Sequence, residues 1–462
     1  MFNGMREKFI GNKVFYKTVF MIMLPILFQN AITNFVNMLD NIMIGQVGTL
    51  QMSAVSIVNQ LIFIFNLLVF GSLSGAGIFS SQFFGNKNYE GVKQCFRFKL
   101  LTGFIVGSLG TIILYLYAEP LTSLYMNPET NSLQNIKETL TYASSYIRYI
   151  IIGLLPFAVS QCISSTIRES GETILPMISS LCAIFINLIF NYLLIFGHLG
   201  FPKLGTDGAA IATSLSRFVE LTFLLVVAYK MRDRLPAFKK VLPLKIEHSL
   251  AKKIISKGTP LAMNEFFWSF GVAAINQCYS TRGLNVVAAN NIAGTIYSLF
   301  IMACIAMGNT IAIIIGQKLG ANQIDEAIDY NRKLTFLSFS MCIVLSAIML
   351  ILAKPFPNLY NVTSDVKSIA TTMILVDGFL MPVAALYNSA YFTLRSGGKA
   401  LLTSLFDSGL TCLLALPVAF ILSRFTSLPL VPMYIIVRSL DIIKGALGIY
   451  LIRKKVWINR LI

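Results

Sequence analysis

The sequence predicts an all-α membrane protein with twelve transmembrane helices arranged as two pseudo-symmetric bundles of six. Three observations lead to this prediction: an apolar composition, twelve apolar windows of spanning length, and a resemblance between the two halves of the chain. Of the 462 residues, 56% are hydrophobic and only 12% are charged, and the mean hydropathy is +0.72. This composition excludes a water-soluble protein of this size.

The net charge of +17 does not indicate a nucleic-acid-binding protein, because the basic residues lie between apolar segments and not in one exposed patch. The seven cysteines lie mostly in apolar segments and form no CxxC pair. We therefore expect neither disulfides nor a cysteine metal site.

Each apolar window is long enough to cross the hydrocarbon layer, which takes about 20 helical residues. The first window is too long for a signal peptide, so we expect it to remain as the first span. The twelve windows are 18–44, 54–82, 100–118, 139–165, 174–196, 208–229, 254–280, 286–316, 334–353, 367–393, 401–422 and 430–452.

The linkers between these windows alternate in charge. The linkers after even-numbered spans, together with both termini, hold about 27 of the 37 Lys and Arg residues, and the other linkers hold about six. The positive-inside rule then predicts that both termini and the basic linker between the halves are cytoplasmic. A solvated loop at the membrane surface explains the basic run of that linker without a nucleic acid.

The two halves of the sequence are related. Shifting the first half by 235 residues aligns Pro, Gly and Gln residues over about a hundred positions without a gap. Such matches carry weight because chance matches in a membrane protein involve mainly Leu and Ile. Further along, Arg168 aligns with Arg395 after a slip in the register. The first matches are Pro25 with Pro260, Gly48 with Gly283, Ala54 with Ala289, Gln82 with Gln317, Gly85 with Gly320 and Pro120 with Pro355.

Because each half holds six spans, both halves enter the membrane from the same side. Parallel repeats of this kind are typical of alternating-access transporters. We predict an N-lobe at residues 1–229, a cytoplasmic linker at 230–253 and a C-lobe at 254–462.

The first span carries a polar stripe. Its polar residues step by three and four, so they share one face of a helix that must avoid lipid. The acid in the stripe, Asp40, is a functional-site hypothesis by default, whereas the amides alone could equally pack helices together. Pro25 removes one backbone hydrogen bond, so we expect a bend or hinge there. The stripe consists of Asn30, Thr33, Asn34, Asn37, Asp40 and Asn41.

Several charges inside the spans have a structural explanation. Arg217 and Glu220 are three residues apart and can neutralise each other. A ladder at the same spacing is formed by Arg438, Asp441 and Lys444, and Asp407 lies at the depth of Lys444. We expect these groups to pair.

Asp40, Glu265 and Asp377 have no basic neighbour one turn away on their own helices. An unpaired acid in a low dielectric takes up a proton or holds a cation. Glu265 and Asp377 lie near the middle of their spans, and both behaviours suit a coupling site.

Four oxygen-bearing groups share the depth of Asp40 near the outer ends of the first, fifth and sixth spans. They are Asn187, Asn191, Thr213 and the carbonyl of Ala209. A carboxylate surrounded by neutral oxygens suits a hard cation such as Na⁺. The alternative is a hydrogen-bonded cluster that only packs three helices.

Several motifs resemble the MATE (multidrug and toxic compound extrusion) family of cation antiporters. They are MLDNIMIGQVG, SSQFFGNKN, RESGET, NLIFNYLLIFG and DGAAIAT. Together they spread over most of the chain. The resemblance is to bacterial members, and it is closer to the NorM-type branch.

The resemblance implies a V-shaped pair of six-helix bundles that expels organic cations in exchange for Na⁺ or H⁺. By motif, Asp40 matches the acid of the first helix, and Asn187, Asn191 and Thr213 match the cation site of the N-lobe. Glu265 and Asp377 match C-lobe acids of the NorM-type branch. This sequence has Asn191 where archaeal DinF-type members have an acid, and Met373 where NorM-type members have a tyrosine.

We therefore predict a monomeric antiporter of the cell membrane that exports amphipathic cations and needs no cofactor besides its coupling ion. A single carboxylate among neutral oxygens favours Na⁺ over H⁺. Further candidates for the substrate cavity are Gln29, Asn30, Asn34, Phe35, Asn37, Phe266 and Tyr297.

The sequence leaves two alternative functions to compare with export. A flippase for lipid-linked sugars shares the repeat design, but it would line its cavity with arginines for pyrophosphate. A membrane enzyme would need a nucleophile, metal or nucleotide motif, and no HExxH, GxSxG or GxxxxGK[ST] is present.

Overall fold

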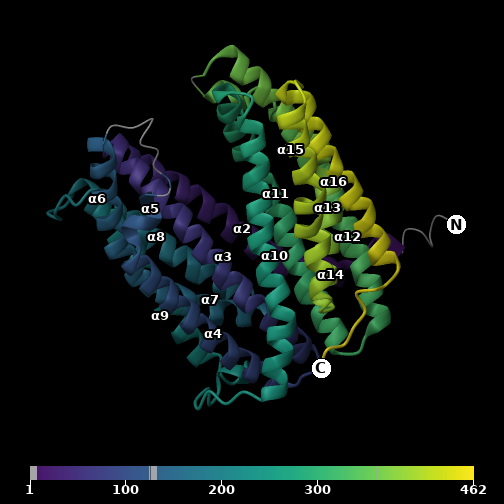
Figure 1. Ribbon diagram of the computed structural model, residues 1–462. Coiled ribbons are helices and arrows are strands. Elements are labelled where there is room, and N and C mark those ends of the chain that lie inside the picture. The colour runs from purple at the N-terminus through teal and green to yellow at the C-terminus, as the bar shows by residue number, and fades with distance from the viewer. Residues whose placement is uncertain (1–7, 124, 126–132, 361) are drawn as a thin grey trace. The chain divides into compact units, whose positions relative to one another are not determined.

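The computed structural model describes residues 8–123, 125, 133–360 and 362–462, and this part of the chain is helical, without strands (Figure 1). The helices of the first half are α2 (Lys13–Gly45), α3 (Thr49–Gly85), α4 (Tyr89–Leu116), α5 (Ala118–Ser123), α6 (Leu133–Ile150), α7 (Leu154–Glu169), α8 (Ile174–Phe196) and α9 (Thr206–Lys230). Those of the second half are α10 (His248–Ser280), α11 (Leu284–Gly320), α12 (Ile324–Leu352), α13 (Ser364–Ser396), α14 (Ala400–Ser404), α15 (Leu416–Phe425) and α16 (Leu430–Arg453). Short turns of 3-10 helix are η1 (Ile151–Gly153), η2 (Pro236–Phe238) and η3 (Phe356–Leu359), and π-helical turns are η4 (Leu405–Gly409) and η5 (Thr411–Ala415).

Each of the twelve predicted spans lies on a helix or on a run of consecutive helical segments, which confirms the predicted fold class. Within the described residues, ten of these helical stretches are long and apolar enough to cross a membrane. The other two spans lie on α10 and α16. Helix α16 carries three charged residues in its middle: Arg438, Asp441 and Lys444.

The chain divides into two compact units. Unit 1 comprises residues 1–27, 81–87 and 259–462, and unit 2 comprises residues 28–80 and 88–258. The predicted lobes were drawn from spans and not from contacts, so the boundaries at 229 and 254 stay a prediction. Helix α2 continues through Pro25, and the proposed hinge at this residue also stays a prediction.

In unit 2, α8 packs on α9, and α7 packs on α4 and α9. Small residues make these contacts close. A Cβ atom on Gly208 would lie 2.7 Å from the backbone of Leu194, and one on Gly153 would lie 2.9 Å from the Cα atom of Ser214. Close approach at small residues is how membrane helices gain packing energy. These contacts bring polar residues of α8 next to those of α9, such as Asn187 next to Thr213.

Two spans are interrupted beside a proline. Pro156 has no N–H to donate to the carbonyl of Ile152, and the 3-10 turn η1 separates α6 from α7 at that point. In unit 1, π-helical turns separate α14 from α15 just before Pro417. Asp407 lies on the first of these turns, and π-helical turns are frequent at functional sites.

The core of unit 1 surrounds α13, which packs against α11, α12 and α16. Its buried side chains include Met373, Ile374 and Met381 from α13 and Met433 and Val437 from α16. An acid within this segment of α13 is therefore enclosed by protein.

Candidate functional site

Unit 2 contains a polar cavity of about 590 Å³. It is lined by α2, α3, α8, α9 and the segment from α6 to α7. Its volume suits a drug-sized ligand. The sequence-predicted site residues that line it are Gln29, Asn30, Asn37, Asp40, Asn187, Asn191, Ala209 and Thr213.

Asp40 is held by amides. The Asn191 amide nitrogen Nδ2 donates to Asp40 Oδ1 at 2.7 Å. In the orientation that satisfies its neighbours, Asn187 donates to Asp40 Oδ2 at 3.1 Å and accepts from the Thr213 hydroxyl at 3.1 Å. The structure therefore brings together the four side chains that were predicted to meet: Asp40, Asn187, Asn191 and Thr213. Their role as ion ligands stays a prediction.

Helix periodicity explains how these groups meet. Asn187 and Asn191 are four residues apart on α8, so both point from the same face. Both amides are buried, with 6% and 1% exposure. The oxygen Oδ1 of Asn191 is buried and has no hydrogen-bond partner. A buried acceptor without a donor is costly, and it marks a place where a cation or proton donor fits.

A second polar chain runs along the cavity. Gln29 donates to the Ser180 hydroxyl at 2.7 Å, and Ser180 donates to Glu220 Oε1 at 3.2 Å. Glu220 Oε2 also pairs with Arg217 at 3.2 Å, as predicted from their spacing. All four residues line the cavity.

The sequence predicts only a structural pair for Arg217 and Glu220, and it predicts no role in the site for Arg168. The structure places all three on the cavity wall. The alignment of the two halves contains Arg168, so the sequence does single out this residue. The groups around Arg168 depend on which helices meet at the end of α7, and the sequence does not show this. Arg217 also acts electrostatically on Asp40.

Two predicted cavity residues, Asn34 and Phe35, are not among those that line this cavity. Both are exposed, and the Phe35 side chain has 55% exposure.

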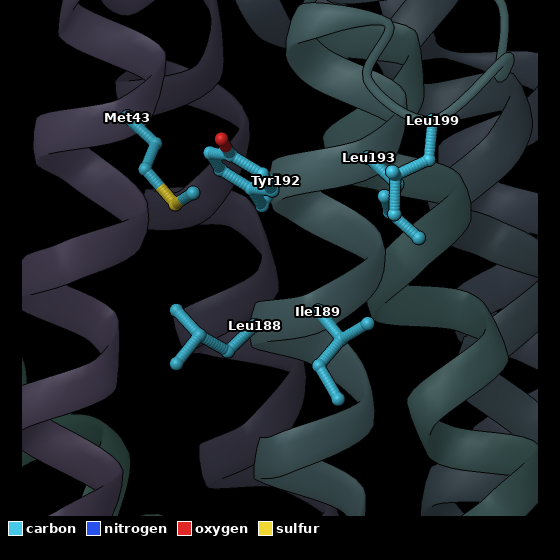
Figure 2. Close-up of a pocket in the computed structure, with 6 residues that line it drawn as sticks. All are labelled: Met43, Leu188, Ile189, Tyr192, Leu193 and Leu199. Carbon is cyan, nitrogen blue, oxygen red and sulfur yellow. The ribbon is translucent and has the colours of Figure 1, made fainter.

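A different face of α8 borders an apolar hollow of about 400 Å³ (Figure 2). Leu188, Ile189, Tyr192 and Leu193 line it from α8, with Met43 from α2 and Leu199 from the following loop. Among the residues that the structure describes, no acid or amide lines the hollow. The amides Asn187 and Asn191 therefore lie on a different face of α8 from the one that borders this hollow.

In unit 1, the prediction that Asp377 lacks a basic partner is wrong. Arg438 lies 2.7 Å from Asp377 Oδ1, and the Tyr434 hydroxyl donates to Asp377 Oδ2 at 2.8 Å. The partner was missed because it lies 61 residues away on α16. Arg438 also pairs with Asp441 at 3.0 Å, as predicted.

Two further unit 1 groups match or refine the predictions. Lys444 pairs with Asp407 at 2.5 Å, as expected from their depth. Glu265 is half-buried and accepts a hydrogen bond from the Tyr391 hydroxyl at 3.1 Å. Its charged neighbours are Arg395 and Asp407.

The predicted aromatic residues of unit 1 lie in different surroundings. Phe266 is 53% exposed on α10 and packs edge-on against Phe267. The ring of Tyr297 faces the guanidinium group of Arg438 at 5.0 Å. Tyr297 therefore already binds a cation of the protein itself.

Among the described residues, no group of three or more His, Cys, Asp and Glu side chains is placed to hold a metal ion. A site with one carboxylate and neutral oxygens matches a monovalent cation or a proton better than a transition metal.

The sequence profile of the MatE family matches residues 25–193 and 260–421, which is well over half of the chain. The chain belongs to the MatE family. The predicted resemblance is thereby confirmed, and the twofold match follows the two halves of the sequence.

Relatives of this MatE protein carry the NorM name. It is 24% identical over 419 residues to a probable multidrug resistance protein NorM of Thermotoga maritima, covering 91% of this chain and 88% of the relative. It is 26% identical over 418 residues to a protein of the same description from Halalkalibacterium halodurans, covering 89% and 88%.

Solved structures share the fold. The structure of a variant of the MATE transporter VcmN of Vibrio cholerae matches with a TM-score of 0.86 at 20% identity, covering 96% of this chain and 97% of that chain. An outward-facing multidrug resistance MATE transporter matches with a TM-score of 0.83 at 17% identity, covering 95% of each chain. This MatE protein is thus a multi-pass membrane protein of a transporter family.

Proposed function

We propose that this protein is a secondary antiporter that exports amphipathic organic cations in exchange for Na⁺, with Asp40 as the coupling carboxylate. The relatives described as multidrug resistance proteins support the transport class. The observation that carries the proposal is the Asp40 carboxylate, held in the unit 2 cavity by amides and not by a basic side chain.

Amide partners make this carboxylate exchangeable. A buried acid paired with arginine loses several kcal/mol when it is separated from its partner. An acid held by neutral amides can instead trade these hydrogen bonds for a cation or a proton. Asp40 has the second kind of environment, which suits repeated binding and release.

The Asn191 amide favours sodium over a proton. Its buried oxygen has no partner while its nitrogen donates to Asp40. Half a turn of the amide presents that oxygen to a cation beside the carboxylate. Together with the hydroxyl of Thr213, the site then offers the oxygen ligands that hard cations prefer. A proton would use the carboxylate alone.

Charge balance explains the exchange of ion for substrate. The cavity wall carries two acids, Asp40 and Glu220, and two arginines, Arg168 and Arg217. Neutralising Asp40 with Na⁺ leaves the wall with an excess of positive charge, which opposes an organic cation. Release of the ion restores the balance and favours the cation.

Reconstituted vesicles test this proposal. Export of a fluorescent organic cation is measured with an imposed Na⁺ gradient, a pH gradient or neither. We expect export with the Na⁺ gradient and loss of that export in the Asp40→Asn variant. Export that follows only the pH gradient would move the coupling role to a proton, and export without any gradient would overturn the antiporter proposal.

We also propose that the protein lies in the cell membrane with both termini and the linker around residues 230–253 on the cytoplasmic side. The basic residues of these segments support this orientation. Single cysteines placed in the linker are then labelled by an impermeant maleimide only after the cells are opened. Labelling of intact cells would contradict the orientation.

A further inference from the structure

The linker between α9 and α10 is folded against α4 within unit 2. Its 3-10 turn η2 packs on α4, where the rings of Phe96 and Phe238 meet edge to face with centroids 5.0 Å apart. Leu235, just before this turn, is buried. Further along, the backbone N–H of Glu247 donates to the side chain of Gln94 at 3.1 Å. The irregular part of the linker is therefore held at both of its ends.

Arg97 of α4 fixes the middle of the linker. Its guanidinium group donates to three backbone carbonyls, those of Lys240 at 2.9 Å, Val241 at 2.8 Å and Lys245 at 3.1 Å. A planar guanidinium holds such a set because its donors point in fixed directions, unlike those of an ammonium group. Residues 240–245 thus form a loop of defined shape, which we call the linker tip.

The linker tip exposes apolar side chains between two lysines. Leu242 is 76% exposed and Leu244 is 40% exposed. Lys240 and Lys245 are exposed at the two ends of the tip. In the part of the chain that the structure describes, neither lysine forms an ion pair with an acid. Leucines gain free energy at the boundary of the acyl chains, while the ammonium groups of lysines stay at the level of the lipid phosphates.

The depth of Arg97 brings the tip to the membrane surface. Arg97 precedes the predicted third span, which begins at residue 100, so it lies about 5 Å from the hydrocarbon layer at a rise of about 1.5 Å per residue. The headgroup layer is about 5 to 8 Å thick on each side of the bilayer. The carbonyls bound to Arg97 therefore lie at the level of the headgroups.

We propose that the linker tip docks into the cytoplasmic leaflet and binds acidic phospholipids, with its leucines at the acyl boundary and its lysines on lipid phosphates. Charge supports this partner, because residues 230–253 carry eight basic and two acidic side chains, and the cytoplasmic leaflet has a negative surface potential. The tip fastens the linker end of unit 2 to the bilayer surface. This inference does not use the proposed export function.

Quenching by lipid measures the docking. An NBD fluorophore is attached to the Leu244→Cys variant of the full chain, and the unaltered protein treated in the same way gives the background from native cysteines. The vesicles contain phosphatidylcholine alone or with about one quarter phosphatidylglycerol. Both leaflets carry a spin-labelled lipid, so the result does not depend on the orientation of the chain. We expect quenching to be several-fold stronger in the acidic vesicles.

Lysine variants test the recognition of charge. Lys240→Gln together with Lys245→Gln should lower the ratio of docked to free tip by about thirtyfold, which is about fivefold for each lysine near an anionic surface. The matched control is Lys252→Gln together with Lys253→Gln. It removes the same charge from exposed positions of α10 outside the tip, and it should change the ratio by less than about twofold.

Arg97→Lys tests the role of the guanidinium group. This variant keeps the positive charge but cannot hold all three carbonyls, so it should also lower the ratio of docked to free tip. Unchanged quenching in this variant would contradict the part assigned to Arg97.

The vesicle series decides between the possible surroundings of the tip. Quenching that needs the acidic lipid and is lost only with the tip lysines supports the inference. Equal quenching in the two kinds of vesicle, or equal losses from the two lysine pairs, overturns the recognition of acidic lipid. A fluorophore that stays unquenched in both kinds of vesicle lies in water or against protein, and this result overturns the docking itself.

Discussion

The two units differ in how they hold the acids that the sequence singled out as unpaired or deep in the membrane. In unit 2, the acid of α2, Asp40, is bound by two amides beside a cavity. In unit 1, Asp377 and Asp407 are bound by Arg438 and Lys444. The same repeat therefore carries an amide-bound acid, Asp40, in one half and the ion-paired acids Asp377 and Asp407 in the other.

The aligned positions show where the two units differ. Ser180 aligns with Asp407, and Arg217 aligns with Lys444. Each of these bases pairs with an acid. In unit 2, Arg217 pairs with Glu220 on its own helix. In unit 1, Lys444 pairs with Asp407, which lies on the π-helical turn η4. The amide of Gln29 donates a hydrogen bond to Ser180 in unit 2. The amide of its aligned residue, Asn264, donates one to Asp407 in unit 1. The base thus lies at the same aligned position in both units, whereas the acid that pairs with it lies at different positions.

The largest effect is expected at Asp40, the acid of the proposed coupling site. Asp40→Asn keeps the size of the side chain and removes its charge, so coupled export should fall to the level of protein-free vesicles. The matched control is Asp207→Asn, which removes an acid of unit 2 that is bound by Ser145 and does not line the cavity. Equal export by the two variants would make Asp40 structural and end the contrast between the units.

Helical spacing was enough to predict most of the unit 2 site. The steps of three and four placed Asn30, Asn37 and Asp40 on one face, and the same rule joined Asn187 to Asn191. It also predicted the pair of Arg438 with Asp441. All of these groups depend on neighbours within one or two turns, or on a shared depth in the membrane.

Contacts between distant helices were not predictable in this way. The partner of Asp377 lies on another helix of unit 1, and no local pattern in α13 announces it. The surroundings of Arg168 likewise depend on Glu169 being bound by Lys99 of α4. Such partners follow from packing, which the sequence of one helix does not determine.

A stability measurement probes the ion-paired side of the comparison. Asp377→Asn leaves Arg438 inside the protein without its main counter-charge. The free energy of unfolding should therefore fall by about 3 kcal/mol. Asp441→Asn is the control, because Asp441 is a more exposed partner of the same arginine. In this variant the free energy of unfolding should fall by less than about 1 kcal/mol. Thermal unfolding in detergent gives both values. If Asp377→Asn unfolds like the unaltered protein but loses export, Asp377 belongs with Asp40 and not with the structural acids.

Glu265 lies between the two classes, because it is half-buried and its hydrogen-bond partner is a hydroxyl. Glu265→Gln should raise the half-saturating concentration of a cationic dye by about fivefold, roughly 1 kcal/mol. A neutral dye of similar size should change less, because it has no charge for the acid to attract. Equal losses for the two dyes would show that Glu265 does not recognise charge.

An effect as small as that at Glu265 is expected at Asn191, and it decides which ion Asp40 exchanges in the proposed mechanism. Asn191 donates to Asp40 and keeps its own oxygen buried without a partner. If that oxygen becomes a sodium ligand, Asn191→Ala removes one of several neutral ligands and should raise the Na⁺ concentration for half-maximal export by about fivefold, roughly 1 kcal/mol. The pH profile of export should stay nearly unchanged, because the carboxylate remains. If the pH profile moves instead and added Na⁺ has no effect, the coupling ion is a proton, and Asp40 keeps its role while the amides act only as hydrogen-bond partners.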